Sequence, residues 1–244
     1  MRPVFLQAIA WVEQQVLAGP DGYESWNPDG HDVPPDPRRF FPDQPRLARL
    51  DLPSRYVICA AGLLPPPCPD MPDATSVILG SSTGSLDADL AFAKSINERP
   101  SPATYARTLP STPGAELAIL RGYRGANFAI IQDSSAGVAA LVAAIHEVSA
   151  GSCEAAVAGE FGAVSGVGCS GFATLCILGS RPSPQGRSRQ ITVVREASGD
   201  DGPPARLDSL LKPFLDLPGS VEFDTTALMC GSLVRIHCGP AQAR

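Results

Sequence analysis

The sequence predicts an α/β fold in which buried helices cover a sheet. Short apolar runs, typical of strands, alternate along the chain with longer segments in which apolar residues recur every three or four positions, typical of helices. The segment between Ser135 and Gly151 is apolar or small nearly all round, which indicates a helix inside the molecule. Strands that alternate with buried helices are typical of a layered α/β domain.

The composition is that of a globular chain. The 244 residues are 44% hydrophobic and 18% charged, which is enough apolar material for one large core, and we expect a single domain over residues 1–244. The 25 acidic residues outnumber the 19 basic ones, and there is no basic tract. This charge pattern argues against nucleic acid binding.

The apolar run at residues 4–12 is interpreted as a first strand and not as a signal peptide, because it is short, interrupted by Gln7 and followed by Glu13. No stretch approaches the roughly 20 apolar residues that a membrane span needs. The seven cysteines are odd in number and mostly lie in apolar runs, which indicates buried thiols in a reducing compartment. We therefore expect a cytoplasmic protein without a membrane span, a metal site or a cofactor.

The other elements of the first half follow from apolar spacing and from turn residues. An irregular connection rich in Pro, Gly and Asp is expected after the first strand, packed down by Trp26, Phe40 and Phe41. The expected ranges are 19–45 for this connection, 46–64 for a buried helix that begins near Pro53, 76–80 for a second strand, 87–97 for a helix capped near Ser85, 100–113 for a proline-broken stretch and 116–123 for a short helix.

The Gly- and Ser-rich segment 80–85 leaves two interpretations open. The amides of a turn between a strand and a helix can bind phosphate. The segment lacks the Gly spacing and the Lys of a P-loop, so an ordinary turn is the favoured interpretation.

Residues 124–160 are the most informative stretch. A strand is predicted over 125–132, with its apolar run 127–131 inside the sheet. Asp133, Ser134 and Ser135 follow, and all three residue types cap helix N-termini. The buried helix then ends at Gly151, before a strand over 155–159. This order places a hydroxyl at a buried strand-to-helix corner, on the positive end of a helix dipole.

The second half is expected to contain more strands and loops. The run 166–171 could be a nucleophile elbow, but Gly-Cys-Ser-Gly does not match Gly-x-Ser-x-Gly, and a loop is favoured. The expected ranges are 161–171 for a glycine-rich segment, 171–179 for a strand, 181–189 for a polar turn, 190–195 for a strand, 197–205 for an exposed loop, 207–217 for a helix and 232–238 for a last strand.

An ordered set of fragments resembles the N-terminal half of a β-ketoacyl-(acyl carrier protein) synthase. The fragments are Gly-Ser-Ser-Thr-Gly at 80–84, Gly-Tyr-Arg-Gly at 122–125, Ser-Ser-Ala-Gly at 134–137, Gly151 and Ala-Val-Ala-Gly at 156–159. The resemblance covers most of residues 1–195 and implies a thiolase-like layered fold of half length, with a buried central helix and a divergent extension over 196–244.

Two departures from that family bear on function. Its nucleophilic cysteine precedes a helix glycine by three residues, and the spacing to Gly137 places Ser134 at that position. A serine hydroxyl stays protonated at a helix N-terminus and needs a neighbouring base. The family's two catalytic histidines belong to a C-terminal half without a counterpart in this sequence. His146 lies twelve positions from Ser134, about 18 Å along the helix, and His31 and His237 lack the family's motifs.

The resemblance therefore implies a half-length chain length factor, the inactive partner of a full-length ketosynthase in type II polyketide systems, of a kind associated with aryl polyene clusters. It implies a heterodimer in which the strand Asn127, Phe128, Ala129, Ile130 and Ile131 pairs across a two-fold axis. An acyl tunnel would run along the interface, lined by Tyr105, Thr108, Leu109, Thr112 and Ser134. Acyl carrier protein would meet this chain through the complex.

Three interpretations of function remain open. The first is the non-catalytic partner, in which Ser134 only caps the helix. The second is a serine-dependent acyltransferase or acyl hydrolase, in which Ser134 accepts an acyl group with a base from elsewhere. The third is a free-standing acyl-binding protein, which requires a stable monomer. For the segment 101–116, which contains these candidate tunnel residues, an ordinary surface loop is the alternative to a tunnel lining.

Overall fold

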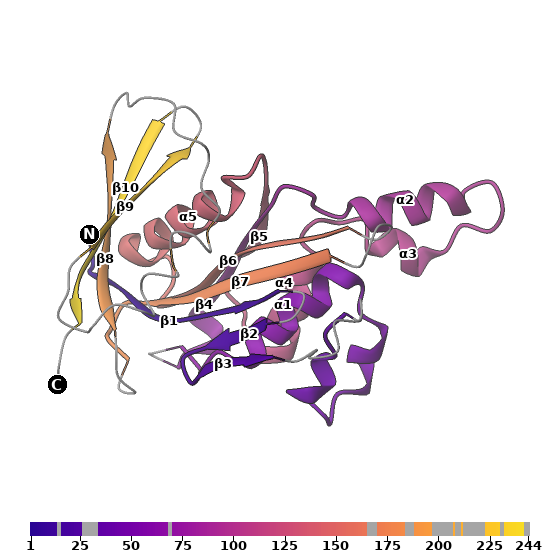
Figure 1. Ribbon diagram of the computed structural model, residues 1–244, viewed down its shortest axis with the longest axis horizontal. Helices are drawn as coiled ribbons and strands as arrows, with labels where there is room; N and C mark the ends of the chain where they lie inside the picture. The colour runs from indigo at the N-terminus through magenta and orange to yellow at the C-terminus, as the bar shows by residue number, and fades with distance from the viewer. Residues whose placement is uncertain are drawn as a thin grey trace.

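The computed structural model describes residues 1–13, 16–25, 34–67, 70–164, 170–183, 188–196, 207, 211, 223–229 and 232–241. These residues form one mixed sheet with helices on both of its faces (Figure 1). The α/β fold predicted from the sequence is confirmed.

The sheet has ten strands. Eight follow the order β5-β4-β6-β7-β1-β8-β10-β9, and β2 and β3 form a hairpin beside β1. The strands are β1 (Val4–Val12), β2 (Val16–Gly19), β3 (Gly22–Ser25), β4 (Thr75–Ser81), β5 (Asn127–Ile131), β6 (Ala155–Val164), β7 (Ser170–Gly179), β8 (Arg189–Glu196), β9 (Phe223–Met229) and β10 (Ser232–Ala241). Only the pairs β4–β5 and β4–β6 are parallel among those described.

The bounds of five α-helices lie within the described residues. They are α1 (Leu52–Gly62), α2 (Leu86–Ser95), α3 (Pro102–Ala106), α4 (Thr112–Arg121) and α5 (Ala136–Ala150), with short 3-10 turns at Pro37–Arg39, Pro45–Arg49 and Pro72–Ala74. Helix α5 covers one face of the sheet, and α1 and α4 cover the other (Figure 1). Helices α2 and α3 form an arm that projects from the body of the molecule.

The two faces of the sheet have separate apolar cores, as the two-residue period of a strand requires. On β4, Ile78 packs with α5, whereas Val77 and Leu79 pack in the cluster that contains α1 and Leu117 of α4. All three side chains are buried, because β4 lies inside the sheet with helices on both sides.

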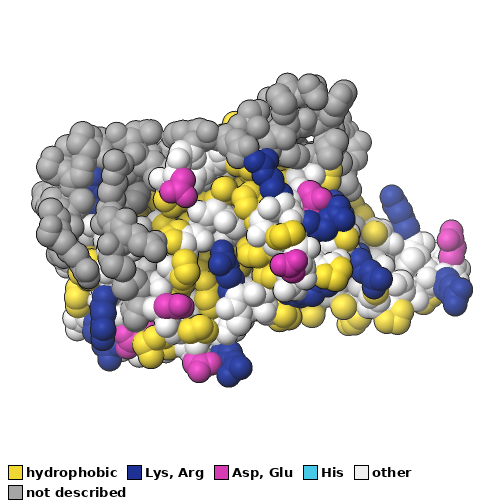
Figure 2. Space-filling model, turned by 90° about the horizontal axis from the view of Figure 1, so that it is seen from below, with side chains coloured by type: hydrophobic (Ala, Val, Ile, Leu, Met, Phe, Trp, Pro, Cys, Tyr) yellow, Lys and Arg dark blue, Asp and Glu magenta, His cyan; other side chains and the backbone are white. Residues whose placement is uncertain are grey.

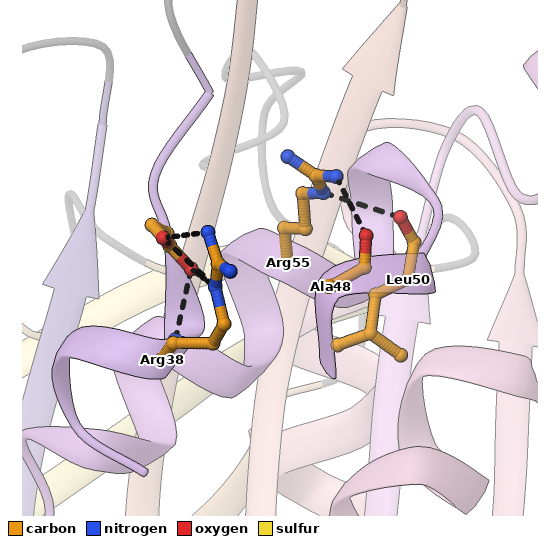
Figure 3. A network of polar contacts seen from close by, with 5 residues as sticks. Arg38, Ala48, Leu50 and Arg55 are labelled. Carbon is orange, nitrogen blue, oxygen red and sulfur yellow. Dashed lines mark hydrogen bonds and ion pairs between the residues drawn. The ribbon is translucent and has the colours of Figure 1, made fainter. Parts of the chain in front are cut away.

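Helix α1 is fixed at its start by charged side chains. The Asp51 carboxylate caps it by accepting a hydrogen bond from the Ser54 amide at 3.1 Å. Arg55 donates to the carbonyls of Leu50 and Ala48, and so ties the preceding turn to the helix (Figure 3). The helix predicted over 46–64 is confirmed in a shorter form, because residues 45–49 make a 3-10 turn instead.

Several other predicted ranges needed correction. The connection expected over 19–45 contains the β2–β3 hairpin and a 3-10 turn in its described part, and Trp26 lies outside the described residues. The proline-broken stretch holds α3, where Pro102 occupies the helix start and Ser101 caps it. Strand β6 extends to Val164, and β9 was not predicted. Most of the ranges 197–205 and 207–217 lie outside the described residues.

Within the part of the chain that the structure describes, no helix has the length and apolar character needed to cross a bilayer. The described cysteines Cys59, Cys153 and Cys176 are buried and form no disulfide, as the sequence predicted. No cluster of three or more His, Cys, Asp or Glu side chains that could hold a metal occurs among the described residues.

Candidate functional site

The corner between β5 and α5 is organised by Asp133. Its Oδ1 accepts hydrogen bonds from the backbone N–H of Ser135 at 2.9 Å and from the Ser135 hydroxyl at 2.6 Å. Gln132 Nε2 donates to the same hydroxyl at 2.8 Å. The hydrogen bonds from Ser135 lower the pKa of Asp133. Asp133 therefore holds the corner as an ionised acceptor.

Ser134 does not cap the helix, so that expectation was wrong. Its side chain is half-buried, and no hydrogen bond of its hydroxyl is found within the described residues. Ser135 occupies the N-cap position of α5, and its own backbone N–H donates a hydrogen bond to the Asp133 carboxylate. The reason is geometric, because an Asx turn from Asp133 reaches the amide two residues on.

No described side chain is hydrogen-bonded to Ser134 as a base would be. Asp133 is bound to Ser135, and His146 is exposed in the last turns of α5. His31 lies outside the described residues, and the side chain of His237 in β10 is not described either. Of the elbow candidate at 166–171, residues 166–169 lie outside the described residues, and Ser170 and Gly171 begin β7. In the described structure, Ser134 is a serine on a helix N-terminus without the partner that would activate it.

Two glycines let α5 begin close to the sheet. A Cβ on Gly80 of β4 would overlap the Ala136 carbonyl, and a Cβ on Gly137 would lie 2.6 Å from Oε2 of Glu160 on β6. Glu160 is 2% exposed, and its carboxylate accepts a hydrogen bond from the Leu207 amide at 2.9 Å. Sequence reasoning missed Glu160. The available signal was a single carboxylate in a strand otherwise made of small and apolar residues.

The segment 80–85 is an ordinary turn, as favoured from the sequence. The Ser81 hydroxyl accepts hydrogen bonds from the amides of Thr83 at 3.2 Å and Gly84 at 2.9 Å. These amides are therefore already occupied and do not form a phosphate cradle. The Ser85 hydroxyl donates to the Thr108 carbonyl at 2.6 Å, which joins this turn to the segment after α3.

Strand β5 lies at an edge of the sheet, which corrects the expectation that it lies inside. Its only described neighbour is β4. Asn127 is exposed, Phe128 is 37% exposed and Ile131 is 47% exposed, whereas Ala129 and Ile130 are half-buried. An apolar run is compatible with a central strand, but here the apolar side chains meet solvent because no strand follows on the outer side.

Most of the exposed large apolar side chains belong to one stretch of the chain, which ends with β5. Of the ten large ones that are exposed among the described residues, eight lie between residues 86 and 131, on α2, α3, α4, β5 and the turns between them. They are Leu86, Leu90, Ile96, Tyr105, Leu109, Ile119, Phe128 and Ile131. Apolar surface gathered in this way marks an interaction site more often than scattered exposure does.

The residues predicted to line a tunnel lie next to the end of β5. Side chains of both Ile131 and Pro110 lie against Gly84, within 3.8 Å of the position its Cβ would take. Tyr105 and Leu109 are exposed, at 61% and 57%. The hydroxyls of Thr108 and Thr112 are half-buried and donate to the carbonyls of Tyr105 and Ala106. Among the described residues, no hydrogen bond joins this segment to Ser134.

A pocket of about 230 Å³ lies on the side of the sheet covered by α1 and α4, away from Ser134. Arg46, Arg49 and Arg107 line it, together with Asp51 and Glu116. Arg46 pairs with Glu116 at 2.7 Å. The face seen from below carries several basic side chains interspersed with apolar ones (Figure 2).

Comparison with known proteins places this fold in a family. The family model described as "Beta-ketoacyl synthase, N-terminal domain" matches residues 52–187, which is more than half of the chain. No significant match was found among curated protein sequences.

Three solved structures show the same fold. "The ishigamide ketosynthase/chain length factor" matches with a TM-score of 0.58 and 15% identity, over 81% of this chain and 68% of that one. "Ketosynthase (ApeO) in Complex with its Chain Length Factor (ApeC) from Xenorhabdus doucetiae" matches with 0.56 and 16%, over 78% and 79%. "AntDE:AntF (apo): type II PKS acyl-carrier protein in complex with its ketosynthase bound to the hexaketide" matches with 0.56 and 13%, over 81% and 70%. On the family match and the shared ketosynthase fold, the chain belongs to the β-ketoacyl synthase family, through its N-terminal domain.

Proposed function

We propose that this chain is a non-catalytic, chain length factor-like subunit that pairs with a full-length β-ketoacyl-ACP synthase and shapes its acyl tunnel. The observation that carries the proposal is β5, an edge strand with exposed apolar side chains directly before the Ser134 corner. Solved ketosynthase and chain length factor complexes share the fold, which supports the choice of partner.

The non-catalytic part of the proposal rests on the chemistry of Ser134. A helix N-terminus can lower a cysteine's pKa enough to produce a thiolate nucleophile. A serine at the same place keeps its proton, and Ser134 has no hydrogen-bonded base among the described residues. Condensation would then occur at the ketosynthase's own nucleophile.

We propose that a strand of the ketosynthase pairs with the exposed edge of β5. An exposed, apolar edge strand offers unpaired backbone groups to another chain, and folded proteins usually cover or blunt such an edge. We assign Asn127, Phe128, Ala129, Ile130 and Ile131 to the interface with the ketosynthase. We propose that the projecting arm lies against the same partner, because α2 and α3 also carry exposed apolar side chains, among them Leu86, Leu90 and Tyr105.

The tunnel assignment follows from proximity to that interface. Tyr105 lies on α3, Thr108 and Leu109 follow it, and Thr112 begins α4. Pro110 of this segment and Ile131 of β5 both lie against Gly84, and we propose that the four residues line the acyl tunnel together with Ser134. The threonine hydroxyls already donate to backbone carbonyls, so the wall they offer to an acyl chain is mainly apolar.

Acyl carrier protein would reach the complex over the arginine-lined pocket. Three guanidinium groups face two carboxylates there, and a carrier's prosthetic arm is attached through a phosphodiester, which Arg binds well. Arg49→Glu is expected to weaken carrier binding to the complex by about tenfold at low salt. Arg181→Glu, at an exposed position between β7 and β8, is the matched control. Equal affinity of the two variants would refute this docking site.

The assembly experiment co-expresses this chain with a neighbouring full-length ketosynthase and measures mass by light scattering after size exclusion. We expect a one-to-one complex, and a chain expressed alone that self-associates or is insoluble, because its apolar surface would be uncovered. A stable monomer that ignores the ketosynthase would contradict the proposal and would favour the free-standing acyl-binding protein.

The second candidate is a serine-dependent acyltransferase or acyl hydrolase. The half-buried, unbonded hydroxyl of Ser134 at a helix N-terminus favours it over other enzymatic functions. It requires an acyl adduct on the isolated chain, visible by intact mass and lost in Ser134→Ala. We further propose that residues 1–244 form one cytoplasmic domain whose family-like part ends near residue 195.

A further inference from the structure

A buried carboxylate lies beneath the start of α5. Glu160 has the same parity along β6 as Ala156 and Ala158, and it therefore points to the α5 face of the sheet. It is 2% exposed. An ionised carboxylate is costly in such a place unless hydrogen bonds or positive potential compensate it.

Two features of the surroundings compensate the carboxylate. Its Oε2 accepts the Leu207 amide at 2.9 Å, in a buried position. The same oxygen fills the space left by the absent side chain of Gly137, in the first turn of α5. The amino end of a helix carries positive partial charge, which favours an anion there.

The hydrogen bond from the Leu207 amide joins Glu160 to a residue that is distant along the chain. Leu207 and Leu211 are helical, four residues apart, and 0% and 2% exposed. Both belong to the apolar cluster that surrounds α5. The hydrogen bond at Leu207 therefore joins Glu160 to a residue that is itself part of this cluster.

We propose that Glu160 is a positioning residue that couples this segment to the Ser134 corner, so that the two loosen together when the carboxylate is removed. The coupling passes from Leu207 through the Glu160 carboxylate to Gly137, which is three residues from Ser134. This inference does not depend on the proposed partner function, since it concerns the chain's own packing.

Hydrogen exchange measured by mass spectrometry tests the coupling. Glu160→Ala is expected to speed exchange about tenfold in the peptide containing Leu207 and Leu211 and in the peptide covering 133–140, with the peptide of β1 unchanged. Glu160→Gln keeps an oxygen acceptor of the same reach and should stay within about twofold of the native chain. Glu154→Ala, at an exposed pair with Arg2 just before β6, is the control.

Wild-type exchange in both peptides of Glu160→Ala would overturn the proposal, and so would faster exchange confined to the Leu207 peptide. If Glu160→Ala does not fold, Gly137→Ala serves as the second variant, because its Cβ would displace the carboxylate from the α5 side. Faster exchange at the Leu207 peptide in that variant supports the coupling, and unchanged exchange there refutes it.

Discussion

At the corner between β5 and α5, the Asp133 side chain has a structural role that Ser134 does not share. Asp133 binds the amide and hydroxyl of Ser135, and these hydrogen bonds hold its pKa below the usual range. These two hydrogen bonds to the Asp133 carboxylate stabilise the turn. Ser134 is left as a neutral hydroxyl, which is a weak nucleophile.

Cys59 in α1 gives a test at this scale. Burial raises the pKa of its thiol well above its ordinary value, to about 12. We expect no alkylation of Cys59 in the folded protein near neutral pH, because the thiolate is the reactive form. Its folded pKa is raised, so its contribution to stability is full below about pH 9 and is lost as pH rises toward 12.

The measurement is peptide-resolved alkylation with and without urea, together with the urea midpoint of unfolding across the alkaline range. Cys59→Ala is the control, and its midpoint should fall less steeply above pH 9. Rapid labelling of Cys59 in the folded chain, at a rate like that of an exposed thiol, would show that the site is open to solvent.

Among the elements, β5 lies at the edge of the sheet and directly before the Ser134 corner. It joins the sheet through β4 alone and continues into α5 across the Asp133 corner. A partner strand docked on β5 would therefore sit close to Ser134. The proposed partner interface and the proposed acyl site would then be joined by β5 itself, a strand of five residues.

Phe128→Arg tests the role of β5. A cation at the centre of an apolar contact is desolvated without a partner, and we expect the affinity for the ketosynthase to fall by about 2 kcal/mol or more. Gln190→Arg, at an exposed position on β8 and five strands away in the sheet order, should leave affinity unchanged. Both variants are compared by titration calorimetry with a circular dichroism check of folding. Equal affinities would place the interface elsewhere.

At the scale of the whole molecule, most of the architecture was predictable from local patterns. Apolar spacing predicted α1, α5 and the strands β1, β4 and β7, because each buries at least one face. The edge position of β5 did not follow from composition, since Asn127–Ile131 has the composition of a central strand. Only the family resemblance, which implies that this strand pairs with a partner chain, pointed to an edge. The hairpin β2–β3 lay in a stretch dominated by turn residues, which hid its short strands.

The site was predictable in place but not in detail. The glycine spacing located the corner, whereas the Asx turn from Asp133 to the Ser135 amide depends on side-chain geometry that sequence does not contain. Glu160 was missed because its significance comes from contacts with Gly137 and Leu207, which are far from it along the chain. The arginine-lined pocket likewise combines residues from separate turns and helices.

The most direct test of the central claim is the turnover of the reconstituted complex with Ser134→Ala in this chain. The account predicts product formation within about twofold of the native complex, because the hydroxyl performs no chemical step and its loss removes only one polar contact. The complex is confirmed intact by size exclusion before the assay. A hundredfold drop in turnover with the complex assembled would contradict the account and assign the chemistry to Ser134.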